Sequence, residues 1–177
     1  MIKKTLALAA LFLTIVCCDK LDDLTKFNID YNTEYTIPAS SILGTPFEFV
    51  TPEVTTNSQQ EFENNDTNAD LVESVKLRDL TLTIQSPTTG DFDFLNEIFI
   101  YINADGLEEI LIASKSGIQE DGSQTLDLDV ENVELREYIL KDSYTLRTQS
   151  VTDQTIEEDH VINIYTNFRV DAKILGL

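Results

Sequence analysis

The chain has 177 residues, with 32 acidic against 12 basic side chains and a formal net charge of −20. Such a charge argues against binding nucleic acid, where Lys and Arg must neutralise phosphate, and against lying on an anionic membrane surface. The length suits one domain with a hydrophobic core. The negative charge is compatible with binding of divalent cations or basic partners.

The N-terminal segment indicates export. Lys3 and Lys4 precede an uncharged apolar stretch, 5–16, which has the length of a signal-peptide h-region and is shorter than the ~20 residues that span a bilayer. Cys17 and Cys18 stand where a small-residue cleavage site would be. This arrangement resembles the lipobox of bacterial lipoproteins, in which the peptide is cut before a cysteine that becomes acylated. The residues before Cys18 fit that pattern better than those before Cys17, so the resemblance implies lipidation of Cys18, with Cys17 as the alternative.

The resemblance also implies a location and a domain plan. We expect a signal peptide over 1–17, a tether over 18–25 and a domain over 26–177. The protein would contact the membrane only through its lipid, and the outer membrane is the expected site, with the domain periplasmic or surface-exposed. Residues 19–23 resemble the Lys-plus-acidic sequences that direct some lipoproteins to the cell surface, although a solvated tether has the same composition. Both cysteines lie at this junction, so the domain has no disulfide and depends on its core.

The first predicted strand is the clearest element of the domain. Apolar or aromatic residues, with Thr33 among them, occupy every odd position of 27–37, and polar residues fill the even positions. This period of two indicates a strand with one buried face, and Pro38 ends it. Phe47 and Phe49 also alternate. Residues 51–65 are polar and predict a loop or a weak edge strand, and Thr67 to Asp70 resembles a capping box opening a helical turn.

The next strand changes parity part-way. Val75 and Leu77 share one parity, whereas Leu80, Leu82 and Ile84 have the other. A β-bulge at Arg78-Asp79 would bring both sets to the core. Residues 87–90 predict a turn, and Phe92, Phe94 and Leu95 are expected to close one end of the core.

The following strand is apolar on both faces, since Ile98, Ile100 and Ile102 alternate with Phe99 and Tyr101, and it is expected to be central. Asp105-Gly106 is a hairpin signal. Beyond it, residues 126–130 alternate, Asn132 is the expected N-cap of a short helix through Lys141, and a strand starts near Tyr144. The longest alternation, 162–174, closes the domain.

These elements predict an all-β fold with minor α. We expect one antiparallel β-sandwich of about seven or eight strands with one or two short helices. The arrangement is immunoglobulin-like or a jelly roll, and strand order stays open.

Catalysis is poorly supported by the sequence. His160 is the only histidine, and the mature domain offers no cysteine nucleophile beyond its terminus. We expect an exposed histidine at the entry to the last strand. A carboxylate-based hydrolase stays an alternative, but a domain without Trp makes a poor sugar cleft. The protein is therefore predicted not to be an enzyme.

Calcium is the better candidate ligand, because acidic residues occur near several predicted strand ends and calcium binds six to eight oxygens. The candidate ligands are Asp91, Asp93, Asp105 and Asp121. None has EF-hand spacing, and a solvated face of an acidic protein has the same pattern. No other cofactor is expected.

The outward sides of the first and last strands carry a second candidate feature. They hold Asn28, Asp30, Asn32, Asn163, Tyr165, Asn167 and Arg169. If these strands pair, they form one polar surface with an aromatic on it, which is either a binding face or an ordinary hydrated sheet face.

The sequence therefore favours a non-catalytic, lipid-anchored cell-envelope protein with a structural or binding role. The alternatives are a calcium-dependent surface binding or adhesion module and the hydrolase. No nucleic-acid partner is expected, and a protein or glycan partner stays open.

Overall fold

A computed structural model describes residues 25–39, 44 and 46–173 of the chain. Cys17, Cys18, the expected signal peptide and the tether up to residue 24 lie outside the described residues, as does Ile174 at the end of the predicted last strand. No helix among the described residues is long and apolar enough to cross a membrane.

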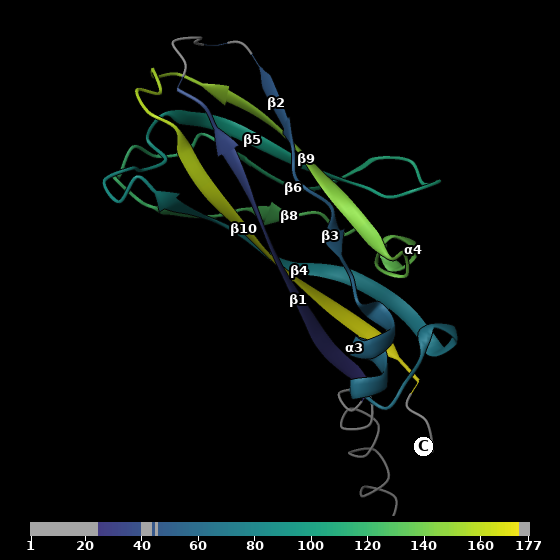
Figure 1. Ribbon diagram of the computed structural model, residues 1–177. Helices are drawn as coiled ribbons and strands as arrows, with labels where there is room; N and C mark the ends of the chain where they lie inside the picture. Colours follow the sequence, from purple (N-terminus) through teal and green to yellow (C-terminus); the bar gives the residue numbers. More distant parts are fainter. Residues whose placement is uncertain (1–24, 40–43, 45, 174–177) are drawn as a thin grey trace, which may run out of the picture.

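The described residues form two antiparallel sheets packed face to face, which confirms the predicted all-β sandwich (Figure 1). In the first sheet the strand order is β1–β10–β4–β7, and in the second it is β2–β9–β5–β6–β8, with β3 also pairing with β9. The first sheet comprises β1 (Lys26–Ile37), β10 (His160–Ala172), β4 (Val72–Ser86) and β7 (Thr125–Asp127). The second comprises β2 (Phe47–Val50), β3 (Val54–Thr55), β9 (Ser143–Thr152), β5 (Leu95–Asn103), β6 (Ile110–Ser116) and β8 (Asp129–Val130).

The pairing identifies which kind of sandwich this is. β1 pairs with β10, β2 with β9, β4 with β7 and β5 with β6, so the pairs nest inward to one central hairpin. A chain folded back as one antiparallel ribbon and then rolled into two sheets is a jelly roll. Of the two arrangements left open by the sequence, the protein has this one. The strand number exceeds the expected seven or eight because β3, β7 and β8 are pieces of two or three residues.

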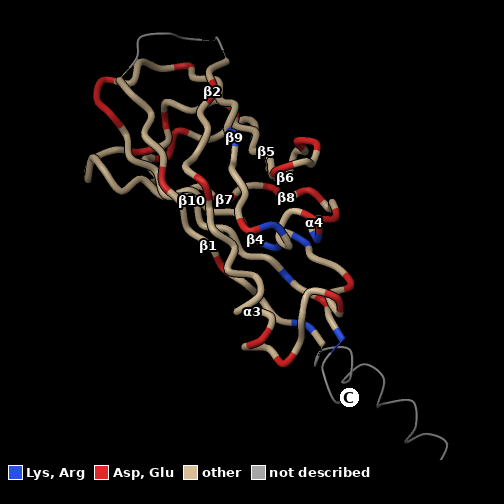
Figure 2. The backbone as a smooth tube through the Cα atoms, turned by 45° about the vertical axis from the view of Figure 1, so that its right-hand side comes forward, with Lys and Arg blue, Asp and Glu red and all other residues tan. Residues whose placement is uncertain are grey.

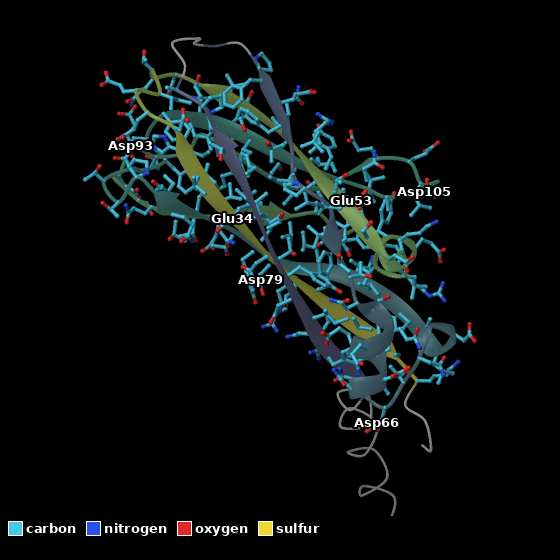
Figure 3. All side chains as sticks on the ribbon, viewed as in Figure 1. Glu34, Glu53, Asp66, Asp79, Asp93 and Asp105 are labelled. Atoms are coloured by element: carbon cyan, nitrogen blue, oxygen red, sulfur yellow. The ribbon has the colours of Figure 1, made fainter. Side chains whose placement is uncertain are left out.

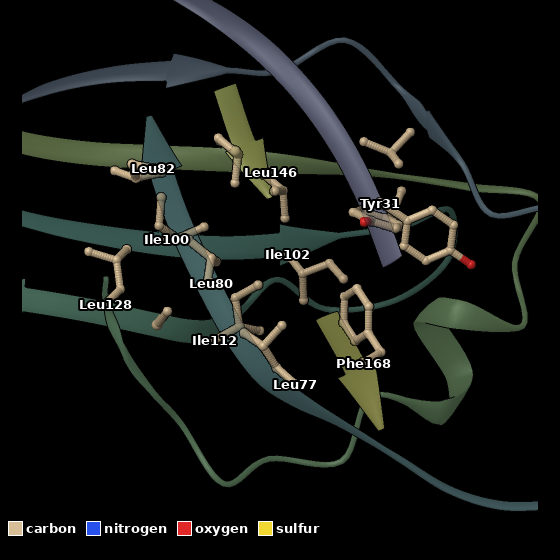
Figure 4. Close-up of a cluster of buried hydrophobic side chains, with 14 of the residues drawn as sticks. Tyr31, Leu77, Leu80, Leu82, Ile100, Ile102, Ile112, Leu128, Leu146 and Phe168 are labelled. Atoms are coloured by element: carbon tan, nitrogen blue, oxygen red, sulfur yellow. The ribbon is translucent and has the colours of Figure 1, made fainter. Parts of the chain in front are cut away.

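The core lies between the two sheets (Figure 4). The apolar positions of the alternating strands form this core, because successive side chains of a strand point to opposite faces of its sheet. Each fully buried aliphatic side chain contributes about 1.5–3 kcal/mol relative to an exposed one. Side chains that are at most 1% exposed include Leu80, Leu82, Ile100, Ile102, Leu146 and Phe168.

The predicted bulge in β4 is confirmed. Asn167 of β10 is opposite Asp79, whereas Phe168 is opposite Leu77, so Arg78 is the extra residue. The bulge turns both halves of β4 toward the core: Val75 and Leu80 are both buried. It also leaves Arg78 and Asp79 together on the outer face, where both are exposed.

The end of the first sheet where β1 begins and β10 ends is covered by a helix that the sequence did not reveal (Figure 1). α3 (Ser58–Asn64) lies in the segment expected to be a loop or edge strand. Its Phe62 is fully buried, and the ring lies edge-on to Phe27 with centroids 6.4 Å apart. One aromatic anchor is sufficient for this short helix, but it gives no apolar periodicity to read.

The cap predicted at Thr67 is wrong. The turn η1 (Ala69–Leu71) is capped by Asn68, whose side chain accepts a bond from the Asp70 N–H at 3.0 Å, and not by Thr67. Thr67 instead donates its hydroxyl to the Lys173 carbonyl at 2.6 Å. The Thr67 side chain therefore satisfies a backbone group at the end of β10 rather than one of the helical turn.

The second helix, α4 (Arg136–Ile139), is shorter than predicted, and Leu135 rather than Asn132 is its N-cap residue. The Glu134 carboxylate accepts bonds from the Arg136 N–H at 3.0 Å and from the Val75 N–H of β4 at 2.8 Å. The carboxylate thereby satisfies one N–H at the start of α4. It also satisfies one N–H of β4 on the edge opposite β10, in the part of β4 that β7 does not reach.

The central position of β5 is confirmed, since it lies between β9 and β6. Its second apolar face is the outer face of the sheet, where Phe99 and Tyr101 are partly exposed. There the Arg147 guanidinium lies 4.2 Å from the Tyr101 ring centroid and pairs with Glu48 and Glu109.

Candidate functional site

The two strands that the sequence analysis compared, β1 and β10, are neighbours in the first sheet and pair over their full length. The condition for a continuous polar surface is therefore met. The register places four polar pairs across the two strands: Asn28 with Arg169, Asp30 with Asn167, Asn32 with Tyr165, and Glu34 with Asn163.

β4 and β7 extend this surface on the other side of β10. Their outward residues are Lys76, Asp79, Thr81 and Thr83 of β4, and Thr125 and Asp127 of β7. We call the outward side chains of β1, β10, β4 and β7 the polar face. Figure 3 shows Glu34 and Asp79 on it. The contributions of β4 and β7 were not predicted, because strand alternation does not say which strand pairs on the second side of β10.

The centre of the polar face is a hydrogen-bonded cluster. The Tyr165 hydroxyl donates to Asp30 Oδ1 at 2.9 Å, and Asn167 Nδ2 donates to the same oxygen. The bond to Asp30 raises the pKa of Tyr165, and burial and the nearby charge of Asp79 raise it further. The phenol therefore stays protonated at neutral pH and acts as a donor that fixes its own ring.

A groove of about 340 Å³ lies beside this cluster. Its walls come from the β4 bulge, from β7 and the residue after it, and from the central aromatic of β10. The lining residues are Arg78, Asp79, Leu80, Thr81, Asp127, Leu128 and Tyr165. Thr81 donates to Asp127 Oδ1 at 2.7 Å, and Arg78 Nε lies 3.5 Å from Asp79 Oδ2.

One atom near the groove lacks a partner. Asn167 is only 6% exposed although it belongs to the outer face, and its Oδ1 accepts no hydrogen bond from the described residues. A buried acceptor without a donor costs roughly 1–3 kcal/mol. Asn167 Nδ2 donates to Asp30 on β1, and on the other side of β10 the register partner of Asn167 is Asp79, which lines the groove.

A cavity of about 420 Å³ lies next to α3 and offers different chemistry. Its lining is polar and mostly uncharged, with Glu63 and Asp142 as the only ionisable groups and no aromatic ring. It contains none of the residues singled out in the sequence.

The four calcium candidates are divided between two regions. The loops of Asp93 and Asp121 are adjacent, since Asp93 Oδ1 accepts a bond from the Gly122 N–H at 2.9 Å. Asp91 and Asp121 each accept a bond from a backbone N–H two residues later, at 3.1 and 2.9 Å. Asp105 lies on the opposite side of the molecule from Asp93 (Figure 3). Within the described residues, no three acidic, His or Cys side chains are placed to hold a metal.

His160 is buried, at 7% exposure, and the expectation of an exposed side chain was wrong. Its Nδ1 lies 2.8 Å from the Glu158 carbonyl, and its ring lies edge-on to Phe94 with centroids 5.1 Å apart. Gly90 also lies close against the ring, which lines a small pocket of about 180 Å³ together with Gly90, Phe94 and Ile156. The ring is therefore part of the packing at this end of the sandwich.

Comparison with known proteins gives likeness of fold alone. No protein-family model matches the chain, and no curated protein matches it in sequence. Among solved structures, turnip yellow mosaic virus is 8% identical with a TM-score of 0.30, covering 85% of this chain and 97% of that one. The decameric BFDV capsid protein is 7% identical with a TM-score of 0.36, covering 82% and 98%. A β-sandwich carbohydrate-binding module is 13% identical with a TM-score of 0.25, covering 79% and 54%.

Proposed function

We propose that the chain is a lipid-anchored protein of the cell envelope that acts without catalysis, by binding a partner through its polar face. The observation that carries the binding role is the in-register pairing of β1 with β10, which sets a hydrogen-bonded polar cluster beside a groove. The anchor rests on the cysteine junction at Cys17 and Cys18 and its resemblance to a lipobox.

The charge distribution is compatible with an anchor at the N-terminal end of β1. Lys26 and Lys173 lie at this end and pair with Asp171 and Glu73 at 3.7 and 2.9 Å. The loops 87–94, 117–124 and 153–159 contain acidic residues and no Lys or Arg. Figure 2 shows Lys and Arg away from the end of the molecule that lies opposite α3. The part nearest an anionic membrane would therefore be repelled least.

We propose that the groove is not a catalytic site because its acidic side chain Asp79 is exposed to solvent. Burial is a common means of tuning the pKa of a general acid or base, whereas the side chains of Asp79 and of its ion-pair partner Arg78 are each 57% exposed. His160 contacts a backbone carbonyl through Nδ1 and is packed in the fold, and no nucleophile among the described residues is bonded to it.

Mass spectrometry of the mature N-terminus tests the anchor. We expect a terminus at Cys18 that carries acyl chains, and conversion of Cys18 to Ala should release the chain from membranes. An unacylated terminus would refute the anchor. Surface proteolysis of intact cells then assigns the membrane face.

The binding role is tested by photo-crosslinking on intact cells. A crosslinker at Asn163 on the polar face should give a discrete adduct, and one at Gln149, which points outward from the other sheet, should not. Equal adducts from both positions would contradict the assignment of the polar face as the binding surface.

A further inference from the structure

We propose that the groove beside Tyr165 binds an arginine or lysine side chain of a basic polypeptide. This inference rests on the proposed function, since it names the class of ligand that the polar face would take. Four features support it: the local charge, the aromatic wall, the unpartnered amide oxygen and the extended polar surface around the groove.

The local charge favours a cation. Asp79 and Asp127 line the groove, and Asp30 lies next to it through its bond to Tyr165. Among the described residues that line it, Arg78 is the only cation. The side chains of Arg78 and Asp79 are each 57% exposed, so their 3.5 Å ion pair is weak and a competing cation can displace it. The chain as a whole, at −20, would draw a basic partner toward this site.

The aromatic wall adds an interaction that a cluster of carboxylates does not supply. Tyr165 lines the groove, and its hydroxyl is held by Asp30. A cation near a tyrosine ring is attracted by the negative face of the π-system. Because the ring is fixed before binding, little side-chain entropy is lost when the ligand arrives.

The Asn167 side chain supplies independent support, because one of its atoms is a buried hydrogen-bond acceptor without a donor among the described residues. Its Oδ1 is buried and accepts no bond from the described residues, and Asn167 is the register partner of Asp79 in the groove. In the proposed complex a ligand N–H replaces Arg78 beside Asp79 and reaches this oxygen from the Asp79 side of β10. A guanidinium carries five donors and could satisfy Asp79 and this oxygen together.

The shape of the surface favours a polypeptide over a bare metal ion. Within the described residues the acidic groups are too dispersed to form a metal cluster, whereas a planar guanidinium can bridge separated acceptors. The polar face continues past the groove along Thr83 and Asn163, which offer further hydrogen-bonding groups to an extended chain.

The test uses the full chain in detergent and fluorescence anisotropy with labelled peptides of Gly and Ser around one arginine. A peptide with citrulline in place of arginine keeps the shape and removes the charge. We expect the arginine peptide to bind at least tenfold more tightly. The double variant D79N/D127N should weaken binding about tenfold, and Y165A by about two- to fivefold.

The matched control is D66N/D105N, which changes the net charge by the same amount at two positions distant from the groove (Figure 3). It should leave binding unchanged, and the melting temperature of each variant checks that it folds. Equal weakening by both double variants would show non-specific attraction and overturn the proposal, as would equal binding of the two peptides or no binding at all. The N-terminal mass of the same sample separates the outcomes: acylation without peptide binding refutes the groove alone, and peptide binding without acylation refutes the anchor alone.

Discussion

Replacement of Gly90 by Ala should destabilise the fold through His160. The φ of Gly90 lies outside the left-handed region, so its backbone can accept a side chain and any cost is steric. A Cβ at this position would lie 2.9 Å from His160 Nε2, 3.0 Å from His160 Cδ2 and 3.1 Å from Pro87 Cδ. Real Cβ atoms essentially never approach a neighbour so closely, so the imidazole would have to move.

The imidazole has little freedom to move away. Its Nδ1 lies 2.8 Å from the Glu158 carbonyl, and its ring packs against Phe94 at 5.1 Å between centroids. Overpacking of a close-packed site costs about 1–3 kcal/mol. For a domain of this size that corresponds to a fall in melting temperature of about 2–12 °C.

A double-mutant cycle measured by chemical denaturation isolates this contact. In the His160→Ala background the added methyl group has room, so Gly90→Ala should cost about 1–2 kcal/mol less than in the wild type. The reasoning would be refuted if Gly90→Ala were within about 0.3 kcal/mol of the wild type, or if the two changes were additive within that margin.

Two further predictions concern the ends of the sheets. Phe62→Ala should cost about 3–5 kcal/mol in a urea titration, since the ring is fully buried against Phe27, and a cost below about 1 kcal/mol would show that α3 is not part of the cooperative unit. Burial alone would raise the pKa of Glu134, but the bonds that its carboxylate accepts from the Val75 and Arg136 N–H groups outweigh burial, so the pKa is lowered. The contribution of Glu134 to the free energy of unfolding is therefore present above the unfolded pKa of about 4.3 and is lost as the pH falls through the folded pKa. In urea midpoints E134Q should therefore be less stable than the wild type at pH 7, and the difference should shrink as the pH falls from about 4.3 through the lowered folded pKa of Glu134, whereas a difference that stays constant over this acid range would contradict the role.

The long strands could be predicted from the sequence because one face of each is buried. In β1 and β10 the alternation continues for a dozen residues, and such runs fix which side chains point inward. The parity change in β4 was informative for the same reason, since only an extra residue at Arg78-Asp79 returns both apolar sets to one core.

Features fixed by contacts distant in sequence could not be predicted. Phe62 is the one buried side chain of α3 (Ser58–Asn64), so the helix lacks the repeated apolar spacing of a longer helix. Asn132 is a good capping residue in isolation, but the bonds of Glu134 to Val75 and Arg136 set where α4 begins. The burial of His160 depends on segments that lie about 70 residues apart in the sequence, which strand alternation does not relate.

The candidate site was predicted in part. The polar residues of β1 and β10 were recognised from their parity, and the structure brings them together as expected. Asp79 and Asp127 were missed as members of the same surface, because the pairing of β4 with β10 and of β7 with β4 follows from the jelly-roll topology. The bulge was the one available signal, since it places Arg78 and Asp79 outside.

The antiparallel pairing of β1 with β10 has a mechanical consequence for a domain held at its N-terminus. Tension on Lys26 along the strand would pull β1 lengthwise against β10, so the hydrogen bonds of twelve register pairs would bear the load together. Force across the strands would instead break such bonds one after another. A domain tethered in this way would resist drag from flow or from a moving partner without a disulfide in its body.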